Sequence, residues 1–313
     1  MFGTDNNDCR VPAVLAAAAG AAVGALGASL FLKPAKTRKQ PTGSGSTTGS
    51  TGGVALYETK KAVNEYLQFH FGSEKDILPY EFGPQSALGF TSRCAILCER
   101  YCEALKDFNG ESDPPSALDV GCAVGGASFE LAKSFEMVVG LDYSQHFVDA
   151  AEKMKTLKCM NYTAQVEGDI YEEYCACIPE DVDVSRVRFL QGDACNIPKT
   201  IGSFDVVLAA NLLCRLPEPA LFLRRLPSLV RPGGIVVLVS PYSWLEAWTP
   251  KQKWIGATVR GSRKEPSCQV LMRELENSFD LVHQEDMPFL IREHVRKYQW
   301  GCSHATVWKR RKP

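Results

Sequence analysis

The sequence predicts an α/β fold in which a mostly parallel sheet carries helices on both faces. Apolar runs of strand length recur along the chain, among them Ala117–Val120, Met137–Leu141 and Phe204–Ala210. Helical spacing follows the first two runs, and such alternation of strands with helices is typical of a parallel sheet. Polar or acidic residues end several runs, so we expect them to meet at the edge where the carboxyl ends of the strands lie.

The central stretch, Ala117–Gly126, reads Ala-Leu-Asp-Val-Gly-Cys-Ala-Val-Gly-Gly. Its glycines allow a tight turn and a close approach of backbone to a ligand. Because helical spacing follows from Ala127, the turn lies at a strand-to-helix corner with free N–H groups. The spacing Asp-x-Gly-x-x-x-Gly differs from the Gly-x-Gly-x-x-Gly of pyrophosphate-binding folds. The candidate ligand-binding residues of this loop are Asp119, Gly121, Cys122, Ala123 and Gly125, although Asp119 could simply cap backbone N–H groups.

Three later strand ends add to this candidate site. Asp142 ends Met137–Asp142, and an ionised carboxylate only accepts hydrogen bonds, as two ribose hydroxyls require. Asp193 follows the apolar Val187–Leu190 and could receive an adenine amino group. The simpler alternatives are a helix cap for Asp142 and a turn for Asp193. The candidate residues at these ends are Asp142, Asp193, Ala194 and Asn211.

The remaining elements follow from periodicity and turn residues. Two amphipathic helices are expected before the first strand, and a helix follows the second strand. A long acidic connection at Cys159–Ser185 is expected to be functional or mobile. The expected helices are Tyr57–His70, Ser86–Phe108, Ser144–Leu157 and Cys268–Phe279. One later strand forms the last part of Leu229–Val239, and two more cover Phe279–Met287 and Ser303–Trp308.

From about Tyr57 to the C-terminus, this order of motifs resembles the class I S-adenosylmethionine-dependent methyltransferases. The resemblance implies a Rossmann-like α/β fold with a mostly parallel seven-stranded sheet and an N-terminal helical lid. It also implies S-adenosyl-L-methionine as the cofactor.

Further motifs resemble the C-terminal methyltransferase domain of ovothiol synthases, a 4-mercaptohistidine N1-methyltransferase. They are Tyr57–Thr59, Glu65–Gly72, Gly121–Gly125, Phe189–Asn196, Ala209–Leu216, Ser240–Glu246 and Pro288–Gln299. This resemblance implies methylation of an imidazole nitrogen of thiolated histidine to give ovothiol A. Many members carry an iron-dependent sulfoxide synthase region before this domain, whereas here an apolar segment and a linker precede it. A separate sulfoxide synthase would then supply the substrate.

Methyl transfer to an imidazole nitrogen needs alignment and the right tautomer more than a strong base. A carboxylate on the far ring nitrogen would fix the tautomer, and arginines would hold the substrate carboxylate. The candidate catalytic residues are Glu58, Glu293, Asn211 and Tyr242. The candidate substrate-binding residues are Tyr57, Arg93, Trp244, Arg292, Arg296 and Tyr298. For each, a packed or solvent-facing structural role is the alternative.

Composition excludes some classes of protein. The 313 residues carry a net charge of −1, which argues against a nucleic-acid partner. The 12 cysteines suggest free thiols in a reducing compartment rather than a disulfide framework. Cys94, Cys98 and Cys102 are expected in the core, and no metal site is predicted. Cys175 and Cys177 lie in the acidic connection, where a structural role is favoured over metal or redox work.

The N-terminal region predicts a membrane anchor. Residues 1–10 are short and polar, and residues 11–32 are uncharged and long enough for a transmembrane helix. Basic residues and a Gly/Ser/Thr-rich flexible linker occupy residues 33–53, so the positive-inside rule places the methyltransferase domain, residues 54–313 with an insertion at 160–185, in the cytosol. The alternatives are a cleaved organelle-targeting peptide and a cytoplasmic protein with a polar tail.

Two other functions stay open. One is a methyltransferase for another small amine, a thiol or a lipid head group, which the apolar segment favours. The other is a tethered module that binds S-adenosylmethionine without turnover, because Ala123 stands where many members carry glycine.

Overall fold

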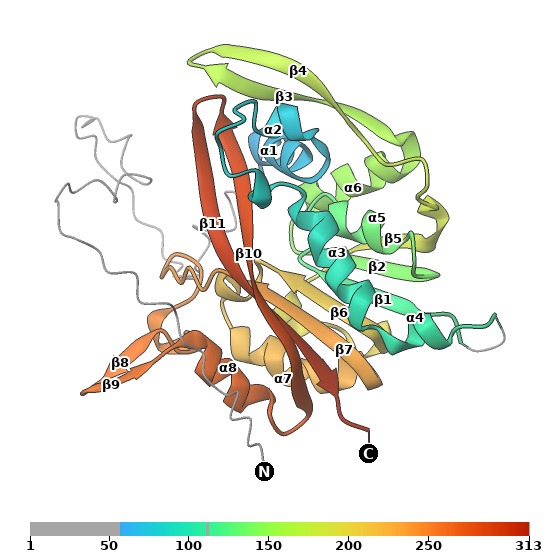
Figure 1. The fold of residues 1–313 in the computed structure, drawn as a ribbon, viewed down its shortest axis with the longest axis vertical. Helices are drawn as coiled ribbons and strands as arrows, with labels where there is room; N and C mark the ends of the chain where they lie inside the picture. The colour runs from blue at the N-terminus through green and yellow to red at the C-terminus, as the bar shows by residue number, and fades with distance from the viewer. Residues whose placement is uncertain (1–56, 111–112, 313) are drawn as a thin grey trace, which may run out of the picture. The chain divides into compact units, whose positions relative to one another are not determined.

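A seven-stranded sheet organises the part of the chain that the computed structural model describes, residues 57–110 and 113–312. Its order is β10-β11-β7-β6-β1-β2-β5 (Figure 1). The five strands from β7 to β5 pair in parallel, whereas β11 is antiparallel to both of its neighbours. The strands are β1 (Ser116–Val120), β2 (Met137–Asp142), β5 (Val187–Gln191), β6 (Phe204–Ala210), β7 (Val230–Ser240), β10 (Phe279–His294) and β11 (Lys297–Arg310). The predicted Rossmann-like, mostly parallel seven-stranded sheet is confirmed.

Helices cover both faces of this sheet because its central strands are apolar on both sides. In β1, Ala117 packs into the core under one face and Leu118 into the core under the other. The first face is covered by α1 (Lys60–Phe71), α3 (Phe90–Tyr101), α5 (Gly126–Leu131) and α6 (Gln145–Leu157). The second face is covered by α7 (Pro219–Leu229) and α8 (Ser267–Leu275). The short helices α2 (Glu74–Ile77) and α4 (Glu103–Asp107) flank α3 in the chain.

The N-terminal helices differ from their predicted bounds for local reasons. The first begins at Lys60 rather than Tyr57 because the Thr59 side chain accepts a hydrogen bond from the Ala62 backbone N–H at 3.1 Å and so caps it. The helix predicted over 86–108 is divided, because the backbone is extended at Cys102 between α3 and α4. Cys94, Cys98 and Cys102 are buried, as predicted for core cysteines.

The segment predicted as a long acidic connection forms a β-hairpin instead. β3 (Cys159–Glu167) pairs in antiparallel fashion with β4 (Ile170–Cys177), and the hairpin crosses α1 (Figure 1). Tyr162 and Ala164 point into the core, which is why this acidic stretch is ordered. Cys159 and Cys177 form a disulfide, which the prediction of free thiols did not include, whereas nine other cysteines among the described residues are free.

β10 and β11 form a hairpin that extends beyond the main sheet. β11 pairs with β7 only between His304 and Lys309, whereas its pairing with β10 continues to His294 and Lys297. The sequence predicted only the sheet-bound parts of these two strands. The extension carries residues from the far edge of the sheet towards the carboxyl ends of the central strands.

The packing of β2 against β5 leaves no room for a side chain at Gly140. A Cβ there would lie 2.6 Å from Cδ1 of Phe189 and 3.0 Å from Sγ of Cys122. We expect Gly140→Ala to lower the free energy of unfolding by about 1–3 kcal/mol, as overpacking does. Urea unfolding measures this loss. Arg188→Ala, at an exposed position of β5, is the control, and an equal loss in both variants would contradict the packing argument.

The predicted anchor at residues 11–32, the polar start at 1–10 and the linker at 33–53 lie outside the described residues. Within 57–110 and 113–312, no helix is both long enough and apolar enough to cross a bilayer.

Candidate functional site

A cavity of about 660 Å³ lies at the carboxyl ends of β1, β2 and β6. This is the usual place for a ligand in an open α/β sheet, and the volume suits a cofactor with a small substrate. Its walls come from the loop after β1, the ends of β2 and β6, helix α1, and the β10–β11 hairpin. The hairpin and α1 thus complete a site that the strand ends begin.

The loop after β1 adopts backbone conformations that favour glycine. Gly121 has φ +80° and Gly125 has φ +88°, and Ala123 between them is also left-handed at φ +47°. A Cβ on Gly121 would lie 3.0 Å from Cδ1 of Leu212, so glycine brings the two loops together. The loop therefore presents backbone, rather than side chains, to the cavity.

Helix α1 closes this loop through His70. Its Nδ1 accepts a hydrogen bond of 3.0 Å from the Gly126 N–H at the start of α5. Burial lowers the pKa of His70 to about 3, so the ring stays neutral and can act as this acceptor. His70 lines the cavity, but its geometry is that of a packed, hydrogen-bonded residue rather than a base.

Asp142 is the most strongly held carboxylate of the cavity. Its Oδ2 accepts from the Ala123 N–H at 2.8 Å, and its Oδ1 accepts from the Ser144 N–H at 2.9 Å. Burial raises its pKa to about 6, against the opposing effect of these backbone N–H groups. Each oxygen keeps a further lone pair, so at pH 7 the ionised group can still accept two ligand hydroxyls.

Hydrogen bonds also hold the other polar residues near the strand ends in place. Asp119 accepts from the Ser128 hydroxyl at 2.7 Å, and burial raises its pKa to about 7. Asp193 accepts from the Cys195 N–H at 2.8 Å and caps a short turn. Asn211, with φ +54°, accepts from the Ser303 hydroxyl at 2.7 Å and so connects β6 to β11.

The structure brings most of the predicted cofactor residues together. The cavity is lined by Asp119, Gly121, Cys122, Ala123, Asp142, Asp193, Ala194 and Asn211, whereas Gly125 supports the loop from behind. Of the other candidates, Tyr57 and Asn211 line the cavity. Tyr57 stacks on Trp248 with ring centroids 5.0 Å apart.

The remaining catalytic candidates do not line the cavity. Glu58 is paired with His146, Glu293 with Lys297 at 2.6 Å, and the hydroxyl of Tyr242 with Nδ1 of His304 at 3.0 Å. The polar group of each of these three candidates is therefore already paired with a neighbouring side chain.

The remaining substrate candidates are also absent from the cavity wall and serve the packing of the hairpin and loops. Arg93 donates to the carbonyls of Leu88 and Pro288, and buried Arg292 donates to the carbonyl of Asp76. Trp244 donates to the Ser267 hydroxyl, Tyr298 donates to the Val295 carbonyl, and Arg296 is exposed.

Sequence reasoning missed a basic residue in the cavity wall. Arg215 donates to the Ser243 carbonyl at 2.9 Å and lies over the ring of Trp248, 5.8 Å from its centroid. Among the described residues that line the cavity, it is the one arginine or lysine. Its position four residues after Asn211, just beyond a strand end, was the available signal. The hairpin adds Phe289, Ile291, Gln299, Trp300, Gly301 and Cys302 to the wall.

The raised pKa of Asp142 predicts a pH-dependent affinity. A ligand that donates two hydroxyls needs the ionised carboxylate, so protonation below about pH 6 opposes binding. We expect the affinity for S-adenosylhomocysteine to fall by up to about tenfold per pH unit below that value. Calorimetric titrations from pH 5 to 8 measure it. Asp142→Asn should bind weakly with no inflection near pH 6, and an unchanged inflection in that variant would contradict the assignment.

Comparison with known proteins gives the class of the site. Residues 118–238 match a family described as a methyltransferase domain. The chain is 28% identical over 193 residues to 2-methyl-6-phytyl-1,4-hydroquinone methyltransferase of Synechocystis sp., covering 58% of this chain and 52% of that protein. It is 29% identical over 164 residues to norajmaline N-methyltransferase of Rauvolfia serpentina, covering 51% and 48%. The chain spans about half the length of these relatives.

A solved structure supports the fold. The crystal structure of the cyclase SpnF has a TM-score of 0.52 at 15% sequence identity, covering 85% of this chain and 98% of that one. At this identity the likeness concerns the fold alone. The match of residues 118–238 to a methyltransferase domain and the similar methyltransferases, rather than this structure, support a class I S-adenosylmethionine-dependent methyltransferase domain in this part of the chain.

Proposed function

We propose that the chain methylates an imidazole nitrogen of a thiolated histidine, with S-adenosylmethionine as methyl donor. The observation that carries this proposal is that acids at the strand ends line the same cavity as Arg215, aromatic side chains and the hairpin. We call the strand-end acids the first half of the site, and Arg215 with the aromatic side chains and the hairpin the second half. A nucleoside cofactor and a small zwitterionic acceptor would thus share one cavity.

The first half fits the cofactor by its donor and acceptor pattern. Asp142 would accept the two ribose hydroxyls, Asp193 the adenine amino group, and the loop at Gly121 would pack against the rest. A Cβ on Gly192, which also lines the cavity, would lie 2.6 Å from Cδ1 of Leu141, so the backbone there is as close-packed as at Gly121. When bound, S-adenosylmethionine supplies an electrophilic methyl group, and the protein's part is to hold it and exclude water.

The second half suits a neutral imidazole with a carboxylate. An imidazole with pKa near ~6.5 is mostly neutral at pH 7, so one ring nitrogen already carries a lone pair. Arg215 would hold the carboxylate through paired N–H donors, while Tyr57 and Trp248 would pack on the ring. Asn211 would orient the far ring nitrogen and fix the tautomer. Alignment alone can supply about 7–11 kcal/mol of the barrier.

Two similar proteins support nitrogen as the acceptor atom. Ajmaline N-methyltransferase and norajmaline N-methyltransferase of Rauvolfia serpentina are 24% and 29% identical to this chain over the matched residues. Methylation of a neutral imidazole nitrogen needs no strong base, and His70, the one histidine among the described residues that line the cavity, is held as a neutral acceptor.

Incubation with 5-thiohistidine and S-adenosylmethionine tests the proposal. Mass spectrometry should show a product heavier by one methyl group, with the methyl on nitrogen by NMR. Histidine is the matched control, because it lacks only the sulfur. Faster turnover of histidine, of another amine or of a lipid head group would overturn the assignment and favour a different small-molecule acceptor.

A further inference from the structure

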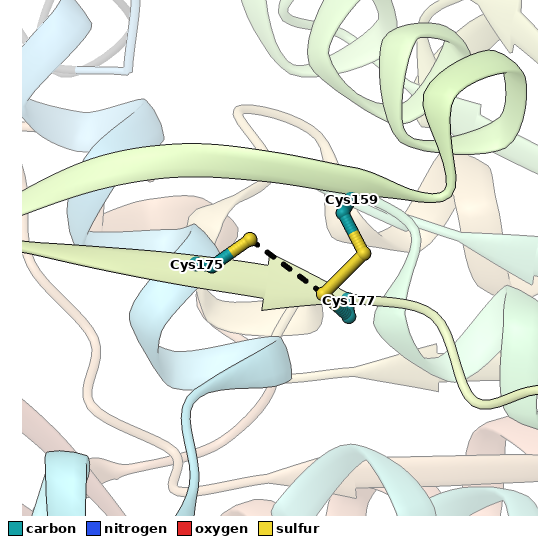
Figure 2. Close-up of side chains that lie close together, drawn as sticks. All are labelled: Cys159, Cys175 and Cys177. Atoms are coloured by element: carbon teal, nitrogen blue, oxygen red, sulfur yellow. Dashed lines mark hydrogen bonds between the residues drawn. A yellow bond between two sulfur atoms is a disulfide. The ribbon is translucent and has the colours of Figure 1, made fainter.

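Three cysteine sulfurs meet at the base of the β3–β4 hairpin, apart from the residues that line the cavity. Cys159 and Cys177 face each other across the two strands, with Cα atoms 4.2 Å apart, and are joined as a disulfide. Figure 2 shows Cys175 beside them, with its Sγ 3.6 Å from Sγ of Cys177. The relevant sulfurs all lie within 4.8 Å of one another.

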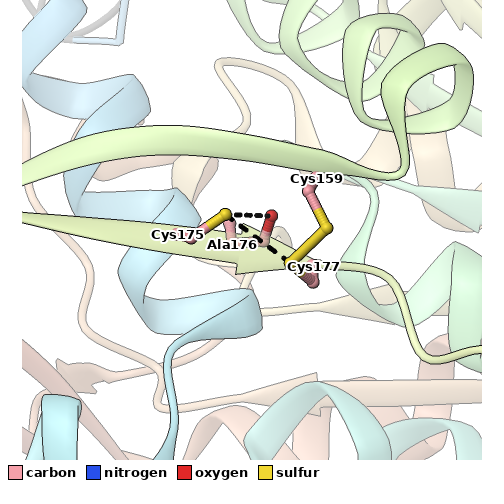
Figure 3. Close-up of a disulfide and its surroundings, with 4 residues drawn as sticks. All are labelled: Cys159, Cys175, Ala176 and Cys177. Atoms are coloured by element: carbon pink, nitrogen blue, oxygen red, sulfur yellow. Dashed lines mark hydrogen bonds between the residues drawn. A yellow bond between two sulfur atoms is a disulfide. The ribbon is translucent and has the colours of Figure 1, made fainter.

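The hairpin geometry places these sulfurs on one side of the strands. Side chains two residues apart in a strand point to the same face. Cys175 and Cys177 are therefore together, and both are exposed, whereas Ala176 between them is buried (Figure 3). Cysteine is among the most buried residue types, so three exposed cysteines in one cluster have no explanation in core packing. Tyr162 and Ala164 anchor the hairpin in the core and keep its strands in register.

We propose that this cluster, once its disulfide is reduced, is a binding site for a thiolate-seeking divalent cation, with zinc as its ligand. Two thiolates on one tetrahedral zinc lie about 3.8 Å apart, given Zn–S bonds of about 2.3 Å. The 3.6 Å between Cys175 and Cys177 already matches that spacing. Cys159, directly opposite Cys177, supplies the third ligand, and water or an added thiol completes the fourth position.

The net charge of this part of the chain favours a cation. Residues 158–181 contain six carboxylates and one basic residue, Lys158, and one of the carboxylates, Asp181, is paired with Lys133 at 3.3 Å. Such a field raises the local concentration of divalent cations. The same negative charge disfavours ionisation of three adjacent thiols in the absence of metal. The thiolate form is therefore stable only when a cation is bound. A structural disulfide alone would need neither the third cysteine nor this charge.

The chemistry has two steps. An external dithiol reduces the Cys159–Cys177 bond, delivers two electrons and two protons, and itself becomes a disulfide. Zinc then binds three sulfurs and displaces their three protons. The site is thus available in the reduced chain and closed in the oxidised chain. Because β3 and β4 pack on α1, the occupied site is connected to a helix that lines the cavity.

Zinc titration of the full chain, monitored with a competing chromophoric chelator, tests the proposal. One sample is oxidised, and the other is reduced with dithiothreitol and desalted under nitrogen. We expect one additional tightly bound zinc in the reduced sample, and Co²⁺ in its place should give the charge-transfer absorption of thiolate ligation. Equal zinc binding by both samples would overturn the proposal.

Variants assign the zinc to these residues. Cys175→Ser keeps the disulfide pair and should weaken the additional site by at least about tenfold, the smallest loss expected when even an outer-shell partner is removed. Cys268→Ser removes a half-buried cysteine elsewhere and should bind zinc as the wild type does. Unchanged affinity in Cys175→Ser, or equal loss in Cys268→Ser, would assign the metal to other cysteines. None of these readouts uses methyl transfer.

Discussion

Replacing Asp142 with alanine should weaken binding of S-adenosylhomocysteine by about 100-fold. The variant would lose two charge-assisted hydrogen bonds to the ribose, each worth about 1.5–3 kcal/mol net, so a loss of about 100-fold is the lower end of the expected range. It would also release the N–H groups of Ala123 and Ser144, which it now orders at 2.8 and 2.9 Å. The loop after β1 would then present a less defined backbone to the cofactor. Isothermal titration calorimetry at pH 7.5 measures the change.

The control separates binding from folding. Asp183 also accepts from a backbone N–H, that of Ser185 at 3.0 Å, but it is exposed and does not line the cavity. Asp183→Ala should leave the affinity unchanged. Circular dichroism and thermal unfolding of both variants check that the sheet is intact. A folded Asp142→Ala variant with the affinity of the wild type would remove the basis for a nucleoside at this strand end.

Replacing Arg215 with alanine should lower kcat/KM for thiolated histidine by about 10–100-fold, mainly through KM. The guanidinium is the one arginine or lysine side chain in the described wall of the cavity. Losing a bidentate charged pair costs about 1.5–3 kcal/mol in substrate and transition state alike. Steady-state kinetics with the thiolated acceptor measures the loss, while the affinity for S-adenosylhomocysteine should stay within about twofold because the cofactor half is untouched.

A second substrate distinguishes recognition from structural damage. Decarboxylated 5-thiohistidine lacks the carboxylate that Arg215 would hold, so wild type and Arg215→Ala should turn it over at similar rates. Arg296→Ala alters an exposed arginine that does not line the cavity and should behave as the wild type with both substrates. If Arg215→Ala lost activity equally with both acceptors, the residue would position the Trp248 loop rather than a carboxylate.

The fold and the strand-end residues that line the cavity could be predicted from the sequence because local patterns determine them. Fully buried parallel strands such as β1 and β6 require mostly apolar side chains on both faces. Residues that end such strands, including Asp142 and Asn211, must meet at one edge of the sheet whatever the loops do. The glycines of the loop after β1 could also be predicted as turn residues, since Gly121 and Gly125 have the positive φ angles that favour glycine.

The part of the cavity wall around Arg215 and the β10–β11 hairpin could not be predicted because it depends on contacts between distant segments. The sequence does not distinguish an arginine that lines a cavity from one that ties a hairpin down. Arg93 and Arg292 are used by backbone carbonyls, whereas Arg215 lies over Trp248 at the cavity wall. The β3–β4 hairpin was missed because its acidic outer face obscured the inward residues Tyr162 and Ala164.

The extension of β10 and β11 past the sheet allows one wall of the cavity to change independently of the strand ends. Phe289, Gln299 and Cys302 come from one contiguous stretch of chain, whereas Asp142, Asp193 and Asn211 end or follow separate strands. Under the proposed function, exchange of that stretch between related proteins would change the methyl acceptor and leave cofactor binding intact. Sequence divergence among such proteins should then concentrate in this stretch, and the strand ends should vary least.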